Sequence, residues 1–316
     1  PARCAPPRTA PFPPPRSRLT LSGALAGCTN AADWKAMQDN RGSNSAEGYD
    51  TSGIEPQDGI IAMLPEGALA DGVLDVAAST DYAPAEFLDT DGTAIGYDVD
   101  LTKAIAAVLG VSSTTHTAEF DSIIAAVGTK YDAGISSFTV TNEREAALDM
   151  VSYINVGSRF TVVAGNPEGV NSSDHLDLCG LTIGFQTGTS QDDAVRADSR
   201  TCVDAGRSAI DLRAYNTQSE ATTALTGGTI DAVYSDSTVA GYAAENTGGE
   251  VETIGETEDA LPQAIVLSKS DPRFNAAIQA AVQYLMDSGI WTDILASWGI
   301  TDAALTTAEM NPKVED

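Results

Sequence analysis

The chain has 316 residues, of which 42% are hydrophobic and 20% are charged, and this length suits one large or two medium globular domains. Its 45 acidic residues outnumber its 17 basic residues and give a formal net charge of -28. A surface of this charge repels phosphate backbones and anionic membranes, which argues against nucleic-acid binding. The apolar runs of the sequence are too short for a membrane-spanning helix.

The first 28 residues are typical of an export segment. Residues 1–18 are rich in Pro and Arg and contain no acidic residue, and residues 19–27 are small and apolar. This order is the pattern of a secretory signal. The four residues that end at Cys28, L-A-G-C, are similar to a bacterial lipobox. That similarity implies that Cys28 is lipidated and anchors an extracytoplasmic protein to the cell membrane.

A flexible tether is expected over residues 29–56, because this segment mixes Asn, Asp, Gly and Ser with few aliphatic residues. Folded sequence is expected to begin near Ile60. The first strand is predicted over residues 73–78. A helix is predicted to follow, with Asp98 as its N-cap and Gly110 at its end.

The stretch from Asp132 to Arg144, D-A-G-I-S-S-F-T-V-T-N-E-R, combines four hydroxyl side chains with one Arg. It is read as a strand, a loop and a helix that Thr141 or Asn142 caps. An Arg in the first turn of a helix gains nothing from the helix dipole. Its position beside free hydroxyls therefore suggests a site for a carboxylate. The alternative is a solvated surface Arg.

Strands alternate with helices through the rest of the chain. Strands are predicted near residues 160–163, 181–185, 212–215, 232–234 and 264–267. The intervening helices begin near Gln191, where Ser190 and Asp193 have capping-box spacing, and near Ser219. The helix that starts at Asp271-Pro272 has the most regular apolar spacing. Such alternation predicts an α/β fold with a largely parallel sheet.

The four cysteines lack the spacing of a zinc site, and so do the two histidines, so neither a metal nor a cofactor is expected. Cys179 and Cys202 lie 23 residues apart in the globular part. In an oxidising compartment a disulfide between them is the natural pairing. The alternative is two buried free thiols.

Four sequence blocks occur in one order over residues 57–300, and together they resemble the polar amino-acid binding proteins of ABC importers, solute-binding protein family 3. The blocks are Y-A-P-A-E-F at 82–87 with G-Y-D-V-D-L at 96–101, F-D at 120–121 with residues 136–144, Q-T-G-T-S-Q at 186–191, and D-A-V-Y-S-D at 231–236.

The resemblance implies a type II periplasmic-binding-protein fold, in which two α/β lobes are joined by two extended hinge strands and the ligand lies between the lobes. Lobe 1 would comprise residues 57–160 and 268–300, lobe 2 residues 161–267, and residues 301–316 a C-terminal tail.

The resemblance also implies a ligand-binding role for nine residues. Arg144 would bind the α-carboxylate of an amino acid, assisted by backbone N–H groups at Thr139 and Ser190, with Thr189 in the same loop. The start of a helix near Ser190 would itself favour an anion. Asp236 would bind the α-ammonium group.

Ser136 and Ser137 would assist Asp236, for which a helix-capping role is the alternative. Tyr82 and Phe120 would form aromatic walls around the ligand side chain, or else belong to the core. Ala85 stands where many family members carry Phe, which predicts an enlarged or reshaped side-chain pocket.

Two functional hypotheses follow. The first is a monomeric, non-catalytic receptor that captures an α-amino acid by hinge closure and delivers it to an ABC permease. The second is an enzyme on the same fold, such as a dehydratase, or a sensor domain. The acidic charge of the chain, with Glu86 near the cleft, favours neutral or cationic amino acids over Asp and Glu.

Overall fold

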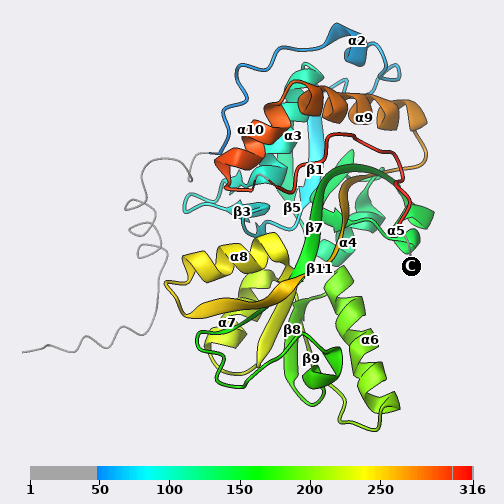
Figure 1. The fold of residues 1–316 in the computed structure, drawn as a ribbon. Helices are drawn as coiled ribbons and strands as arrows, with labels where there is room; N and C mark the ends of the chain where they lie inside the picture. Colours follow the sequence, from blue (N-terminus) through cyan, green and yellow to red (C-terminus); the bar gives the residue numbers. More distant parts are fainter. Residues whose placement is uncertain (1–47, 301, 315–316) are drawn as a thin grey trace, which may run out of the picture.

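The computed structural model describes residues 48–300 and 302–314. The predicted export segment, Cys28 and most of the expected tether lie outside these residues. Figure 1 shows two groups of helices and strands, one above the other, with the chain passing between them more than once.

The main sheet has eight strands in the order β5-β1-β6-β11-β7-β10-β8-β9, and a small sheet has the order β2-β3-β4. The strands of the main sheet are β1 Val73–Ala78, β5 Ser112–Thr117, β6 Ala133–Thr139, β7 Asp149–Val163, β8 Thr182–Gln186, β9 Asp211–Tyr215, β10 Ala232–Asp236 and β11 Val251–Leu267. Those of the small sheet are β2 Asp81–Tyr82, β3 Glu86–Leu88 and β4 Ala94–Ile95.

The helices of the described part cover both groups of strands. They are α2 Asp58–Ile61, α3 Tyr97–Val108, α4 Phe120–Ala126, α5 Asn142–Ala147, the 3-10 helix η1 His175–Leu178, α6 Ser190–Asp204, α7 Gln218–Thr226, α8 Ser237–Asn246, α9 Pro272–Asp287 and α10 Ile290–Ser297.

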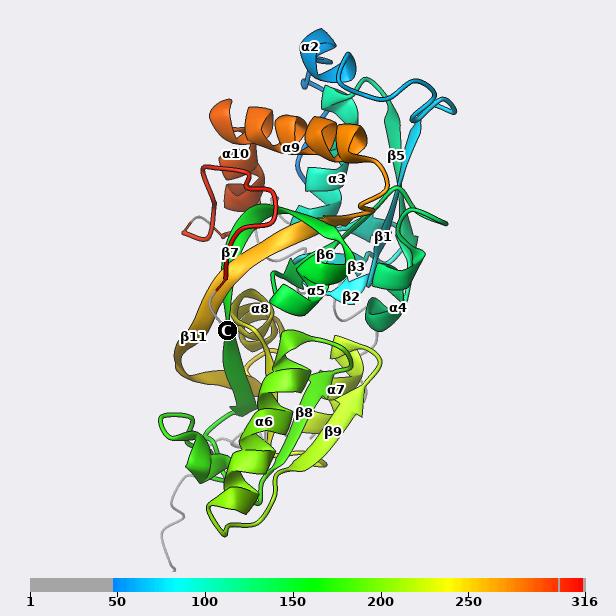
Figure 2. The same cartoon turned by 90° about the vertical axis from the view of Figure 1, so that its right-hand side faces the viewer.

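Strands β7 and β11 connect the two lobes. They pair with each other antiparallel over most of their length. At one end β11 pairs with β6, and at the other end β7 pairs with β10. The parallel pairs β1–β5 and β1–β6 lie on one side of this ribbon, and β8–β9 and β8–β10 lie on the other (Figures 1 and 2). The predicted fold class is therefore confirmed.

Each lobe buries its own core. In lobe 1, α9 places Ile278, Val282 and Leu285 against the sheet, as its apolar spacing predicts. Burial of each such side chain stabilises the fold by roughly 1.5–3 kcal/mol. Trp291 of α10 joins the same core, and its Nε1 donates a 2.7 Å hydrogen bond to the carbonyl oxygen of Tyr153. A separate cluster around Phe185 forms the core of lobe 2.

The predicted disulfide between Cys179 and Cys202 is confirmed. The two Cα atoms are 5.5 Å apart and the sulfur atoms are bonded. The bond joins the end of η1 to α6 and belongs to the core of lobe 2.

Both ends of the described chain pack against lobe 1. Residues 48–56 fall in the expected tether, yet the Tyr49 backbone N–H donates to Asp100 at 2.8 Å and Ile54 packs on the core. In the expected C-terminal tail, Ala304 and Met310 form isolated bridges with β7. Single bridges have no periodic sequence pattern, so the sequence offers no signal for them.

Two predicted helix starts are wrong by one residue or more. Helix α3 begins at Tyr97 because Gly96 is its N-cap, with φ at 129°, and Asp98 lies inside the helix. Only Gly fits there, since a Cβ atom would lie 2.1 Å from the carbonyl oxygen of Ala85. Helix α6 is capped by Thr189, whose hydroxyl accepts a hydrogen bond from the Asp192 N–H, rather than by Ser190.

Candidate functional site

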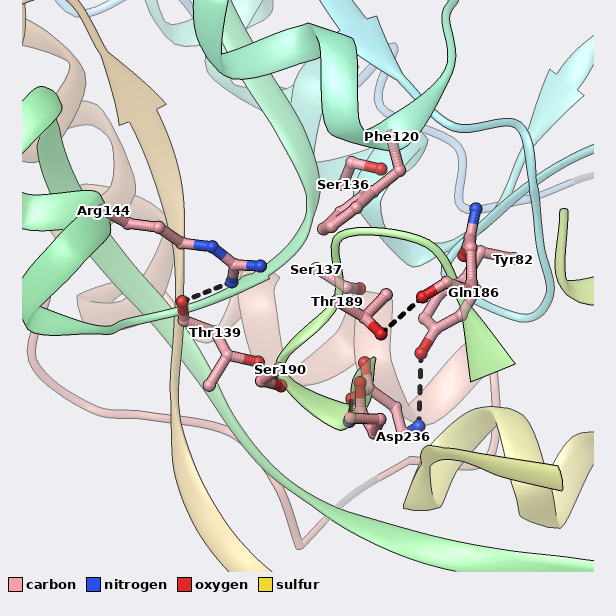
Figure 3. Close-up of a pocket in the computed structure, with 11 residues that line it drawn as sticks. Tyr82, Phe120, Ser136, Ser137, Thr139, Arg144, Gln186, Thr189, Ser190 and Asp236 are labelled. Atoms are coloured by element: carbon pink, nitrogen blue, oxygen red, sulfur yellow. Dashed lines mark hydrogen bonds between the residues drawn. The ribbon is translucent and has the colours of Figure 1, made fainter. Parts of the chain in front are cut away.

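A small cavity lies between the lobes, and all nine predicted site residues line it (Figure 3). Its lining residues are Tyr82, Phe120, Ser136, Ser137, Thr139, Arg144, Gln186, Thr189, Ser190, Gln191 and Asp236. Arg144 is the one cationic side chain of this lining and Asp236 the one carboxylate.

The last residues of β6 supply the hydroxyl groups of lobe 1. Ser136, Ser137 and Thr139 are all buried at the carboxyl end of this strand. Binding sites of open α/β sheets commonly lie outside the carboxyl ends of the strands. Ser137 has a φ of 50°, a left-handed conformation that costs energy for a residue with a Cβ atom.

Arg144 is held from both lobes. Its backbone N–H donates to the hydroxyl of Thr141, which caps α5 as predicted. Its guanidinium donates from Nη1 to the Thr139 carbonyl oxygen at 2.7 Å and from Nη2 to the Gly188 carbonyl oxygen at 3.1 Å. It is 9% exposed, so the alternative of a solvated surface Arg is wrong.

The electrostatic setting of Arg144 favours an anion beside it. Burial lowers the pKa of Arg144, and the nearby carboxylates of Asp193 and Asp236 oppose that shift. A guanidinium in a protein stays charged. Its centre lies 5.6 Å from the ring centroids of both Phe120 and Phe138, which is within the range of cation–π contact.

The start of α6 faces Arg144 from lobe 2. The hydroxyls of Ser190 and Thr139 lie 3.2 Å apart and join the lobes. Helix α6 is 15 residues long, and the unpaired N–H groups of its first turn give this end a partial positive charge. The side of the cavity that holds Arg144 and Ser190 is thus the electropositive side.

Asp236 ends β10 and is 3% exposed. Its Oδ1 accepts a 2.8 Å hydrogen bond from Gln191 Nε2, and its Oδ2 accepts a 2.7 Å bond from Gln263 Nε2. Although Asp236 precedes α8, its side chain makes no capping hydrogen bond, so the capping alternative is wrong. Burial raises the pKa of Asp236 to about 6, and the bonds from the two glutamines oppose that shift.

The two aromatic residues lie in the cavity wall and also pack into the protein. Phe120 stacks on Phe138 with centroids 4.7 Å apart. The Tyr82 hydroxyl accepts a 3.2 Å hydrogen bond from the Asp236 N–H and thereby reaches across to lobe 2 (Figure 3).

Ala85 does not reshape the pocket. It is fully buried in the core of lobe 1 beside Gly96, and it is not among the cavity-lining residues. The expectation of an enlarged side-chain pocket at Ala85 is therefore wrong. Sequence spacing alone does not show that the residue before β3 is buried in the core of lobe 1.

Two lining residues, Gln186 and Gln191, were not predicted. Gln186 Nε2 donates to Ser79 Oγ of lobe 1 at 3.1 Å, and Gln191 Nε2 also donates to Ser158 Oγ at 2.7 Å. Both flank the T-G-T-S loop of the recognised block, which is the signal that could have identified them.

Glu86 lies behind the cavity rather than in it. It is fully buried, and its Oε1 accepts a 2.5 Å hydrogen bond from Ser136 Oγ. Burial raises the pKa of Glu86 well above its usual range, with the nearby Asp98 carboxylate adding to the shift. The sequence places Glu86 near the cleft, and the structure places its side chain behind the cavity wall, outside the cavity lining.

No group of three or more His, Cys, Asp or Glu side chains in residues 48–300 and 302–314 is arranged to hold a metal ion. No helix in the same ranges is long and apolar enough to cross a membrane.

Two lobes on a two-stranded hinge, with a buried polar cavity between them, define the type II periplasmic-binding class. Within it, residues 74–301 match the bacterial extracellular solute-binding proteins, family 3, and the chain belongs to this family.

Proteins and solved structures similar to this chain are described as arginine-binding or amino-acid-binding proteins. The chain is 33% identical over 297 residues to the arginine-binding protein ArgT of Corynebacterium glutamicum, covering 93% of each chain. It is 30% identical to an ancestral arginine-binding protein solved with arginine, with a TM-score of 0.65 and coverage of 72% of this chain and 98% of that one. It is 26% identical to an ancestral amino-acid-binding protein described as a precursor of cyclohexadienyl dehydratase, with a TM-score of 0.65 and coverage of 73% and 96%.

Proposed function

We propose that the protein is the substrate-binding component of an ABC importer for a cationic amino acid, with L-arginine as its ligand. The observation that carries the proposal is the charge arrangement of the cavity. One guanidinium and one carboxylate, both buried and both surrounded by hydrogen-bonding groups, line the same small space from different lobes. An α-amino acid presents the complementary pair of charges.

In the proposed complex the ligand α-carboxylate pairs with Arg144 and with N–H groups at Thr139 and Ser190. The α-ammonium group donates to Asp236, assisted by Ser136 and Ser137. Charge-assisted hydrogen bonds of this kind are the strong ones in proteins. Tyr82, Phe120 and Thr189 complete the walls.

The preference for a cationic side chain rests on the relatives, because those that cover most of this chain are described as arginine-binding proteins. The cavity itself argues against an acidic side chain. Arg144 is the one cationic side chain lining the cavity, and it is assigned to the α-carboxylate. The side-chain carboxylate of glutamate would be left without a cation, and burial of an unpaired charge is costly.

Ligand binding couples to hinge closure in this proposal. The bonds from Arg144 to Gly188 and from Asp236 to Tyr82 cross the cleft. A ligand that contacts both lobes favours the closed arrangement by its differential affinity for the two states. A permease then recognises the closed form, and a monomer without catalytic activity is sufficient for this role.

Calorimetric titration with L-arginine, L-glutamine and L-glutamate tests the proposal. We expect micromolar or tighter binding of L-arginine, with L-glutamate bound at least tenfold more weakly. A protein that binds glutamate tightly and ignores arginine would refute the assignment of the ligand class, and turnover of L-arginine would refute the non-catalytic role.

The membrane anchor is a separate part of the proposal and rests on the L-A-G-C sequence that ends at Cys28. We expect the protein produced in a bacterial host to partition with membranes and a Cys28→Ser variant to lose that partition. Equal partition of both forms would refute lipidation at this residue.

A further inference from the structure

The small sheet of lobe 1 contacts lobe 2 at points outside the ligand cavity. Its strands β2 and β3 pair antiparallel, with Asp81 opposite Phe87 and Tyr82 opposite Glu86. Directly opposite residues of an antiparallel pair lie on the same face of a sheet, and successive residues of one strand point to opposite faces. Asp81 and Phe87 therefore share one face, and neither residue lines the cavity.

Asp81 contacts the start of α7 in lobe 2. Ser219 Oγ, in the first turn of this helix, donates a 2.6 Å hydrogen bond to Asp81 Oδ2. The helix start is fixed within lobe 2 by a capping box between Thr217 and Glu220. Burial raises the pKa of Asp81, and the hydrogen bond from Ser219 opposes that shift. The bond thus compensates a carboxylate that is partly removed from water where the lobes meet.

Phe87 contacts α8 of lobe 2, which lies directly below β3 in Figure 1. The ring centroids of Phe87 and Tyr242 are 5.9 Å apart, with an angle of 51° between the planes. On its other side Phe87 packs against Trp298 of lobe 1, whose Nε1 donates to Asp100 Oδ2 at 2.9 Å. Lobe 1 therefore holds the Phe87 ring in place against lobe 2, in an aromatic contact of the favourable tilted kind.

These two contacts differ from the other contacts between the lobes. The hydrogen bonds across the cleft described above each include a residue that lines the cavity, so a ligand changes them directly. The four residues of the two contacts here do not line it. A contact that forms on closure without touching the ligand stabilises the closed state equally for every ligand. The apparent affinity then follows the population of the closed state.

We propose that Asp81 and Phe87 are positioning residues that hold α7 and α8 against lobe 1 in the closed form and thereby raise the affinity for a ligand that they do not contact. Their shared side of the β2–β3 pair is a closing face, separate from the ligand site. This inference rests on the proposed function, because it requires ligand binding to be coupled to hinge closure.

The test removes the partners on lobe 2, with the variants Ser219→Ala and Tyr242→Ala. Ser219 is exposed, and Tyr242 lies outside both core clusters of lobe 2. We expect each single variant to bind L-arginine about threefold to tenfold more weakly, and the double variant at least about tenfold more weakly. The measurement is calorimetric titration. Because Ser219 is exposed, its single variant tests the inference even if the double variant does not fold.

Stopped-flow kinetics provide a readout that a merely structural role would not change. The closing face forms only after the ligand has entered the cleft. Its loss should therefore raise the dissociation rate of L-arginine by the factor lost in affinity, with the association rate within about twofold of wild type. Damage to the fold would instead lower the fraction of protein that binds and leave the release rate of the remainder unchanged.

A double-mutant cycle identifies the partner of Ser219. Asp81→Ala removes the acceptor of the same hydrogen bond, so its combination with Ser219→Ala should weaken binding no more than either single variant does. Thr226→Ala is the matched control, since the hydroxyl of this α7 residue donates to the Thr223 carbonyl oxygen of its own helix. Leu88→Ala, which removes an exposed side chain of β3, is the control on lobe 1. Both controls should bind L-arginine as wild type does.

Two results would overturn the inference alone, with the proposed function intact. One is a folded Ser219→Ala or double variant whose affinity and dissociation rate for L-arginine equal those of wild type. The other is a cycle in which the losses from Asp81→Ala and Ser219→Ala multiply, as they do for residues that do not interact. A wild-type protein that binds none of the twenty amino acids would instead overturn the proposed function and this inference with it.

Discussion

Arg144 and Gly188 lie on opposite sides of the cleft and are joined by a 3.1 Å hydrogen bond from the guanidinium Nη2 to the carbonyl oxygen. The same guanidinium is bonded to Thr139 of its own lobe. Arg144 therefore links the lobes as well as marking the electropositive side of the cavity. Its replacement should affect both ligand affinity and closure.

Asp236→Asn should weaken binding of L-arginine by about tenfold to a hundredfold, because the ligand ammonium loses a charged acceptor. Gln191 and Gln263 also donate to this side chain, so an amide NH₂ group in place of one oxygen meets a donor. Small-angle scattering should show the ligand-saturated variant to be more open than saturated wild type. Asp211→Asn, on the exposed surface of lobe 2, is the control. Equal affinity and equal scattering curves would contradict the role of Asp236.

Loss of the Cys179–Cys202 disulfide should lower the free energy of unfolding by about 2–4 kcal/mol, chiefly because the unfolded chain is less restricted. The variant Cys179→Ser with Cys202→Ser can be compared with wild type by urea denaturation, with and without reductant. The free energies of unfolding of the two proteins should differ without reductant and should be equal with reductant. A difference that survives full reduction of wild type would point to lost packing at Cys202, which is fully buried, rather than to the bond.

The buried carboxyl groups should make stability fall as the pH rises. Burial raises the pKa of Asp98 to about 7 and that of Asp236 to about 6, against 3.8 for an unperturbed Asp. Between these values the native state binds more protons than the unfolded state, so their contribution to stability is complete below pH 3.8 and is lost by about pH 7.

Comparison with Asp236→Asn isolates one of these groups from the other acids. Relative to wild type, the variant should be more stable at pH 7.5 than at pH 4.5, as measured by urea denaturation at both values. A stability difference that is the same at the two pH values would show that the pKa of Asp236 is not raised.

The sequence was sufficient for the family, the two-lobe fold and nine of the eleven residues that line the cavity. The reason is that Ser136, Thr139 and Arg144 form a short local motif whose spacing fixes their positions at one strand end. Burial is less visible in a sequence. The burial of Glu86 and Asp98 against Ser136 and Ser137 depends on β3 and α3 meeting behind β6, which no local spacing specifies.

The same limit explains the other errors. Ser190 and Asp193 have the spacing of a capping box, but the adjacent Thr189 takes the cap because its hydroxyl also donates to the Gln186 carbonyl oxygen at 2.7 Å. The position of Ala85 is set by the close approach of Gly96 to its carbonyl group. The first outcome comes from local hydrogen bonds of Thr189, three residues away in each direction, and the second from a contact between β3 and α3.

The central claim is that Arg144 and Asp236 bind opposite ends of one amino acid, and calorimetric titration of Arg144→Ala tests it most directly. We expect this variant to lose at least a hundredfold in affinity for L-arginine, because the ligand carboxylate is buried without its partner. The loss of the bond to Thr139 should also lower stability by about 1 kcal/mol. Arg213→Ala, on the exposed surface of lobe 2, should bind as wild type does.

Agmatine, which is arginine without its carboxylate, completes the measurement. Wild type should prefer L-arginine to agmatine strongly, and Arg144→Ala should show a much smaller preference, since only the N–H groups at Thr139 and Ser190 remain to bind the carboxylate. If Arg144→Ala binds L-arginine with wild-type affinity, or keeps the full preference over agmatine, the assignment of the cleft is wrong.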